Sequence, residues 1–125
     1  MKIEALDHVQ LAMPEGREDE ARTFYHDLLG IPEIAKPSNL TGRGGAWFVR
    51  DGLKIHLGVD KNFSPARKAH PAFIVTGLEE LIVTLTNAGF EPAKDEPLEG
   101  FDRIYVHDPF GNRIELMEPV GKLSD

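Results

Sequence analysis

Cysteine is absent from the 125-residue sequence, which excludes disulfide bonds, thiolate metal ligands and cysteine nucleophiles. Apolar runs are strand-sized, far below the roughly 18 residues of a membrane-spanning helix, and the N-terminus lacks the long apolar core of a secretory signal. The 14 basic residues are outnumbered by 21 acidic ones and are scattered, whereas a nucleic-acid partner needs a concentrated basic face. We therefore expect a cytoplasmic protein with neither a membrane nor a nucleic-acid partner.

The remaining composition is that of a folded protein. Apolar residues make up 41% and charged residues 28% of the chain, a normal globular mixture. The length suits one ordinary domain and is too short for two. We expect a single domain that spans residues 1–125.

Within that domain the same order of predicted helices and strands occurs twice. Each half shows an apolar strand pattern, an amphipathic helix that ends at a glycine, a short strand, and two further strands joined by a turn. The first half has these elements at residues 3–13, 17–29, 31–35, 46–50 and 53–59. The second half has them at residues 69–75, 78–88, 90–93, 102–107 and 113–118. The prediction is an α+β protein of two modules, about 1–60 and 68–120. Because each alone has too little core, two modules, from one chain or from two, should share a site.

The turns predict the register of the two hairpins. A two-residue turn at Asp51-Gly52 places Trp47 opposite His56. In the second hairpin, pairing Asp108 with Asn112 places Tyr105 opposite Glu115, and a one-residue slip would reverse the face.

Strand alternation separates apolar from polar side chains. His8, His56, His70 and Glu115 all fall on the face that points away from the helix of their module. His8 and His70 occupy equivalent places on the first strands, and His56 and Glu115 equivalent places on the last strands. Three imidazoles and one carboxylate suit Zn, Ni, Fe, Mn or Co, and the lack of thiolates favours a site with open positions. We predict a divalent transition-metal site, although His56 could instead be a neighbouring base.

The motifs resemble those of the vicinal oxygen chelate superfamily, which includes glyoxalase I, fosfomycin-resistance thiol transferases, extradiol dioxygenases and bleomycin-binding proteins. The likeness extends over nearly the whole chain and is most specific in its last motif. The residues that carry it are Asp7-His8-Val9, Phe24-Tyr25, Leu29-Gly30-Ile31, Ala69-His70-Pro71-Ala72, Asn87-Ala88-Gly89-Phe90 and Asp108-Pro109-Phe110-Gly111-Asn112-Arg113-Ile114-Glu115-Leu116. The resemblance implies two βαβββ modules that form a cup-shaped half-barrel of mixed sheet, with the helices outside.

Glyoxalase-like members use four ligand positions, here His8, His56, His70 and Glu115, although His56 stands where glyoxalase I has Glu or Gln. The favoured hypothesis is a small glyoxalase-type lyase or isomerase that acts on an oxygen-chelating small molecule through an enediolate-like intermediate. Glu115 would be the catalytic base and His56 a partner base.

Two alternatives remain open at this point. A thiol transferase or extradiol dioxygenase would use His8, His70 and Glu115 as a metal triad. A non-catalytic drug-binding resistance protein would use Trp47 and the acidic surface.

Three further residues are candidates for binding a substrate. Trp47 either forms an apolar wall of the site or packs in the core. Arg103 could hold a carboxylate or phosphonate beside Tyr105, or be an exposed strand charge.

Two half-cups per chain also predict a homodimer.

Overall fold

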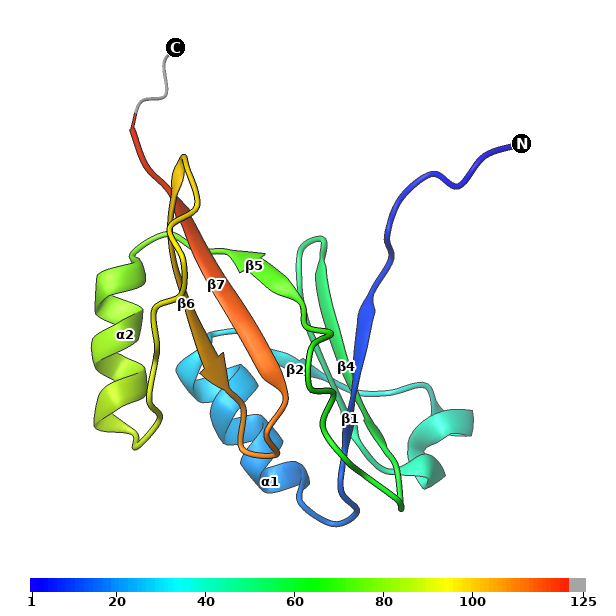
Figure 1. The fold of residues 1–125 in the computed structure, drawn as a ribbon. Coiled ribbons are helices and arrows are strands. Elements are labelled where there is room, and N and C mark those ends of the chain that lie inside the picture. The colour runs from blue at the N-terminus through cyan, green and yellow to red at the C-terminus, as the bar shows by residue number, and fades with distance from the viewer. Residues whose placement is uncertain (122–125) are drawn as a thin grey trace. The chain divides into compact units, whose positions relative to one another are not determined.

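The computed structural model describes residues 1–121 and contains two compact units, residues 1–64 and the residues from Pro65 onward. Each unit has its own sheet and its own helical segment (Figure 1). Both sheets are mixed, which confirms the α+β class. No helix within residues 1–121 is both long and apolar enough to cross a membrane.

The first unit is built on a four-stranded sheet in the order β1-β4-β3-β2. Strand β1 (Val9–Met13) runs parallel to β4 (Leu53–Val59), which pairs antiparallel with β3 (Ala46–Arg50). Strand β2 (Glu33–Ile34) is the far edge, antiparallel to β3. The sheet therefore joins the start and the end of the unit side by side in β1 and β4.

The helical segment of the first unit packs its apolar stripe on this sheet. A short α1 (Glu18–Ala21) continues directly into η1 (Arg22–Leu28), which has the wider turn of a π-helix. Phe24 and Tyr25 are fully buried, and the Tyr25 ring stacks on Phe48 of β3 with 5.5 Å between the ring centroids. A 3₁₀-helix, η2 (Ser38–Arg43), lies in the connection between β2 and β3.

The second unit has a three-stranded sheet in the order β5-β7-β6. Strand β7 (Arg113–Pro119) lies in the middle, parallel to β5 (Ala72–Ile74) and antiparallel to β6 (Phe101–His107). Helix α2 (Leu78–Asn87) buries Leu78 and Leu85, and its first two backbone N–H groups are capped by the Glu118 carboxylate.

The loop between β6 and β7 is folded around one buried carboxylate. Asp108 accepts hydrogen bonds from the backbone N–H of Phe110 and Asn112 and from the Asn112 side chain, at 2.8–2.9 Å. Gly111 has a φ of +93°, a conformation that L side chains rarely adopt. The Asp-Pro-Phe-Gly-Asn motif thus fixes the register that β7 and its Glu115 follow.

Four predicted strands are wrong in extent. The structure has strand only at 9–13 of the predicted 3–13, because only those residues pair with β4, and Ile3 is left 96% exposed. Strand β2 is likewise limited to Glu33–Ile34 of the predicted 31–35, the two residues that pair with β3. The predicted strand at 69–75 is reduced to 72–74, since Pro71 has no N–H to donate. At 90–93, where Pro92 interrupts the ladder, a single bridge joins Ala93 to Tyr105.

Candidate functional site

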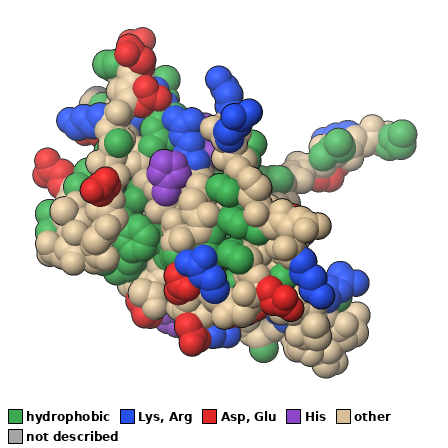
Figure 2. Space-filling model, turned by 60° about the horizontal axis from the view of Figure 1, so that its bottom comes forward, with side chains coloured by type: hydrophobic (Ala, Val, Ile, Leu, Met, Phe, Trp, Pro, Cys, Tyr) green, Lys and Arg blue, Asp and Glu red, His purple; other side chains and the backbone are tan. Residues whose placement is uncertain are grey.

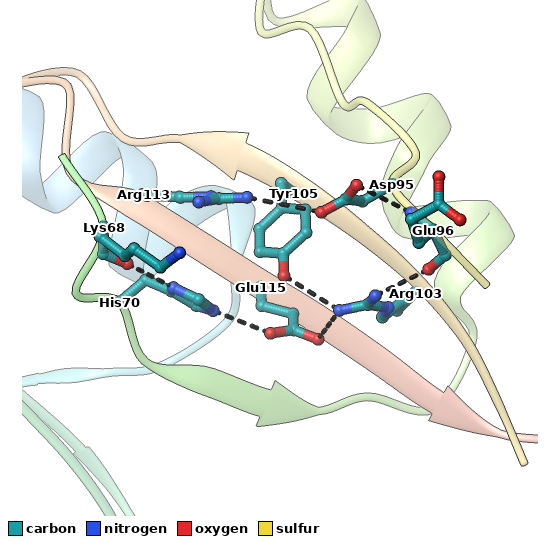
Figure 3. Close-up of polar contacts among 8 residues, drawn as sticks. All are labelled: Lys68, His70, Asp95, Glu96, Arg103, Tyr105, Arg113 and Glu115. Carbon is teal, nitrogen blue, oxygen red and sulfur yellow. Dashed lines mark hydrogen bonds and ion pairs between the residues drawn. The ribbon is translucent and has the colours of Figure 1, made fainter. Parts of the chain in front are cut away.

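A histidine and a glutamate of the second unit meet in the structure (Figure 3). Glu115 lies in the middle of β7, and its backbone N–H donates to the carbonyl of Pro71, which follows His70. This pairing brings His70 Nε2 to 2.9 Å from Glu115 Oε1. The Glu115 side chain is 8% exposed and that of His70 is 23% exposed, so the pair is largely shielded from water.

The other nitrogen of His70 defines how this ring is protonated. Nδ1 lies 2.9 Å from the carbonyl oxygen of Lys68, which can only accept, so Nδ1 carries a hydrogen. In neutral His70 the Nε2 lone pair would then face the carboxylate. A cation next to Nε2, either a proton or a metal ion, therefore satisfies this arrangement.

Arg103 of β6 holds the other oxygen of Glu115. Its Nη1 lies 3.0 Å from Glu115 Oε2 and 3.0 Å from the Tyr105 hydroxyl, and its Nη2 donates to the carbonyl of Glu96 at 2.7 Å (Figure 3). Among the buried side-chain atoms of residues 1–121, Arg103 Nε has no hydrogen-bond partner. The hydrogen bond with Glu115 raises the pKa of Arg103, so the guanidinium is a permanent cation here.

These neighbours keep Glu115 ionised. Burial raises the pKa of Glu115, but the hydrogen bonds from His70 and Arg103 outweigh it and hold the pKa below its ordinary value of 4.5. At neutral pH the side chain is a carboxylate, the form that ligates metals.

Arg113 is a member of this cluster to which the sequence analysis assigned no role. Its guanidinium lies 3.9 Å from the centroid of the Tyr105 ring, a cation–π contact, and 3.7 Å from Asp95. Arg113 and Glu115 are two residues apart on β7 and therefore lie on one face of the strand. Together with the confirmed pairing of Tyr105 with Glu115, this alternation could have identified Arg113 from the sequence. Two guanidinium groups therefore border one phenol.

In the first unit, His8, His56 and Trp47 form a stack of three rings. The His56 ring lies 3.8 Å from the Trp47 ring and 4.2 Å from the His8 ring, centroid to centroid, and the planes are nearly parallel. The predicted pairing of Trp47 with His56 across the hairpin is confirmed. Trp47 thus covers a histidine face, rather than filling the apolar core.

The stack affects the charge of His56. Burial lowers the pKa of His56, and the nearby His8 lowers it further, so this imidazole is neutral at pH 7 and keeps a lone pair. His8 precedes β1, is more exposed, and lies 3.0 Å from Asp7, which also binds Lys54. A neutral imidazole is the form that ligates a metal or accepts a proton.

The structure thus presents the four predicted ligands as two pairs, one in each unit. Within residues 1–121, no three His, Asp or Glu side chains come close enough together to hold an ion. A pocket of about 300 Å³ in the second unit lies between α2, residues 94–98 and β6. Arg103 lines this pocket, but His70, Tyr105 and Glu115 do not, so its shape alone would not identify the pair.

The surface is consistent with the composition. On the face drawn in Figure 2, Lys and Arg side chains stand in separate groups, with acidic and apolar side chains between them. This face therefore carries no continuous basic surface of the kind that follows a phosphate backbone.

Comparison with known proteins gives one sequence family and several similar structures. The sequence model of the Glyoxalase/Bleomycin resistance protein/Dioxygenase superfamily matches residues 5–116. None of the curated proteins matches significantly. A glyoxalase family protein from Bacillus anthracis is 48% identical, with a TM-score of 0.90 over 96% of this chain and 98% of its own.

Two more distant structures share the fold. The fosfomycin resistance protein FosX from Listeria monocytogenes is 21% identical, with a TM-score of 0.72 over 99% of this chain and 96% of its own. A glyoxalase/dioxygenase from Nostoc punctiforme is 20% identical, with a TM-score of 0.72 over 97% and 99%. At this low identity the likeness concerns the fold alone.

Proposed function

Because the chain belongs to the Glyoxalase/Bleomycin resistance protein/Dioxygenase superfamily, we propose that it is a metal-dependent enzyme of the glyoxalase type. His8, His56, His70 and Glu115 would hold one divalent transition-metal ion, two ligands from each unit. The substrate would be a small molecule with neighbouring oxygens, converted through an enediolate-like intermediate. The cytoplasmic location and the homodimer remain predictions.

The observation that carries the proposal is the contact between His70 and Glu115. The carbonyl of Lys68 accepts the hydrogen of Nδ1, so that Nε2 of the neutral ring would offer its lone pair to an ion. Two ligands of one ion must lie close together, and His70 Nε2 lies 2.9 Å from Glu115 Oε1. The donor set fits as well, because Glu115 is ionised and His56 is neutral.

When bound, the ion would supply Lewis-acid stabilisation of negative charge on substrate oxygens. The side chains would move the proton. Glu115 is unprotonated at neutral pH, but its lowered pKa makes it a weak base. Losing the hydrogen bond from His70 removes a contribution that lowers this pKa, so a rearrangement at that contact would strengthen Glu115 as a base. His56, neutral and stacked on Trp47, would accept a proton as the partner base.

The neighbouring cations favour a substrate with an anionic or strongly polarised oxygen. Arg103 is already bound to Glu115, Tyr105 and the Glu96 carbonyl. Within residues 1–121, the contacts of Arg113 are a 3.7 Å ion pair with Asp95 and the Tyr105 ring. We therefore propose that Arg113 and the Tyr105 hydroxyl are the main contacts of such an oxygen, and that Arg103 is a secondary one.

The test is activity against metal content. Protein stripped with EDTA is titrated with Zn, Ni, Fe, Mn or Co, and the turnover of methylglyoxal is measured with several thiols. We expect no turnover without metal and stoichiometric recovery with one ion per chain. His70→Gln should abolish recovery, while His107→Gln, a matched histidine at the exposed end of β6, should leave it unchanged.

Three outcomes would contradict the proposal. Full activity of the metal-free protein would refute the metal requirement. Oxygen uptake with catechols in the presence of Fe(II) would show the dioxygenase chemistry instead. A small ligand that binds equally well before and after EDTA treatment, without turnover, would show a binding protein.

A further inference from the structure

The two carboxylate oxygens of Glu115 have different partners. Oε1 faces His70 Nε2 at 2.9 Å, and Oε2 accepts a hydrogen bond from Arg103 Nη1 at 3.0 Å. Since the side chain is buried, no bulk water competes for these oxygens. The predicted ligand is therefore shared between a histidine and a permanent cation.

Arg103 is held firmly in that position. Its Nη1 also contacts the Tyr105 hydroxyl, and its Nη2 donates to the carbonyl of Glu96 in the loop before β6. Arg103 and Tyr105 are two residues apart on one strand, so they lie on the same face of β6. Because of these two further contacts, the guanidinium cannot swing away from Glu115 without breaking other hydrogen bonds.

We propose that Arg103 is a positioning residue. It binds one oxygen of Glu115, keeps this oxygen from the divalent ion, and thereby lowers the affinity of the site for the ion. This inference rests on the proposed function, because it assumes that Glu115 is a metal ligand. With Oε2 committed to Arg103, Glu115 offers one oxygen instead of two. The positive charge of the guanidinium, held beside the carboxylate, also opposes a second positive charge there.

A weakened site has a chemical consequence. A carboxylate that is already bound to another cation binds the ion less tightly, and it is released more readily for proton transfer. Arg103 would thus remain bound to the carboxylate when it leaves the ion, so that Glu115 is never a buried, unpaired charge. The arrangement gives one glutamate both roles assigned to it above.

The test measures ion affinity rather than activity. Isothermal titration calorimetry of Mn²⁺ and Zn²⁺ is carried out on EDTA-stripped wild type, Arg103→Gln, Arg103→Lys and Arg113→Gln. We expect Arg103→Gln to bind the ion at least about tenfold more tightly than wild type. Arg103→Lys keeps the charge and should stay within about threefold. Arg113→Gln removes a cation that, within residues 1–121, has no hydrogen bond to Glu115, and should also stay within about threefold.

A second measurement separates this role from a structural one. Urea unfolding of the ion-free proteins should show Arg103→Gln to be less stable than wild type, because it loses the ion pair with Glu115. Lower stability with tighter binding is a combination that a damaged site does not produce.

Other outcomes overturn the inference. Unchanged or weaker binding by Arg103→Gln would overturn it, and so would an equal gain in Arg113→Gln, which would reveal a general charge effect. If wild type binds no ion, the proposed function fails and this inference falls with it. If wild type binds and Arg103→Gln is identical, the inference alone fails.

Discussion

Glu115→Gln is the most informative single substitution, because it removes the charge while nearly preserving the shape. The Glu115 side chain is 8% exposed and that of Arg103 is 16% exposed, so the variant leaves a largely buried guanidinium without its carboxylate. Removing one partner of a buried ion pair costs about 3–5 kcal/mol. The amide oxygen of glutamine can still accept one hydrogen bond, so we expect the ion-free variant to be destabilised by about 2 kcal/mol.

The larger difference should appear when metal is added. An ion at a hundred times its dissociation constant stabilises the protein that binds it by about 2.7 kcal/mol. Wild type should gain this stability, and Glu115→Gln should gain almost none at the same ion concentration. Urea unfolding can be followed by far-UV circular dichroism and by the fluorescence of Trp47, the one tryptophan of the sequence, whose ring stacks on His56.

Glu118→Gln is the matched control, since it changes the same residue type three positions along β7. Glu118 caps the N-terminus of α2 through Gly77 and Leu78, and it is outside the predicted ligand set. This variant should lose helix-capping stability but keep the full gain on adding metal. An undiminished gain in Glu115→Gln, or an equal loss of the gain in Glu118→Gln, would refute the assignment of Glu115 as a ligand.

The remaining predictions concern stability. The pKa of Glu115 is lower in the folded than in the unfolded protein. Its contribution to the free energy of unfolding is therefore present above pH 4.5 and is lost as the pH falls through the folded pKa. Ion-free Glu115→Gln should show a shallower loss of unfolding free energy between pH 5 and pH 3 than wild type. At Gly45, which has a φ of +82°, a Cβ would lie 2.1 Å from the Leu57 carbonyl oxygen. Gly45→Ala should lose more than about 2 kcal/mol in urea unfolding, while Gly42→Ala, with open space around it, should stay within about 1 kcal/mol of wild type. Asp108→Ala removes the acceptor of three hydrogen bonds and should cost about 2–4 kcal/mol by the same measurement; a loss below 1 kcal/mol would show that the turn does not depend on it.

The hairpins were predictable because local chemistry fixes their register. Asp51-Gly52 fits a two-residue turn, and Asp51 has the φ of +55° that such turns favour, so β3 and β4 begin and end at the predicted residues. The Asp108 loop sets the second register in the same way. Both cross-strand pairs, Trp47 with His56 and Tyr105 with Glu115, followed from counting back from the turn.

The ends of the strands were not predictable from alternation alone. A strand continues only while a neighbour accepts its hydrogen bonds, and that neighbour is distant in the sequence. Residues 3–8 have an apolar pattern without a paired strand, and residues 69–71 are limited by a proline. As a result, His8 and His70 precede their strands instead of lying within them. Their equivalence in the two modules is unaffected by this. His8 is two residues before Gln10, the partner of His56, and His70 is two residues before Ala72, the partner of Glu115.

Strand alternation does not predict which side chain each charged residue contacts. It placed Arg103, Tyr105, Arg113 and Glu115 on one face, but the pairing sets Tyr105 directly opposite Glu115, with Arg103 on the diagonal. Only a long side chain bridges a diagonal of about 7–8 Å, and whether it does depends on rotamers that the pattern does not encode. Arg103 reaches Glu115, whereas Arg113 turns onto the Tyr105 ring. The hydrogen bonding of this carboxylate is therefore set by its diagonal neighbour. For this reason we expect a change at position 103 to alter the proposed ion affinity while every predicted ligand stays the same.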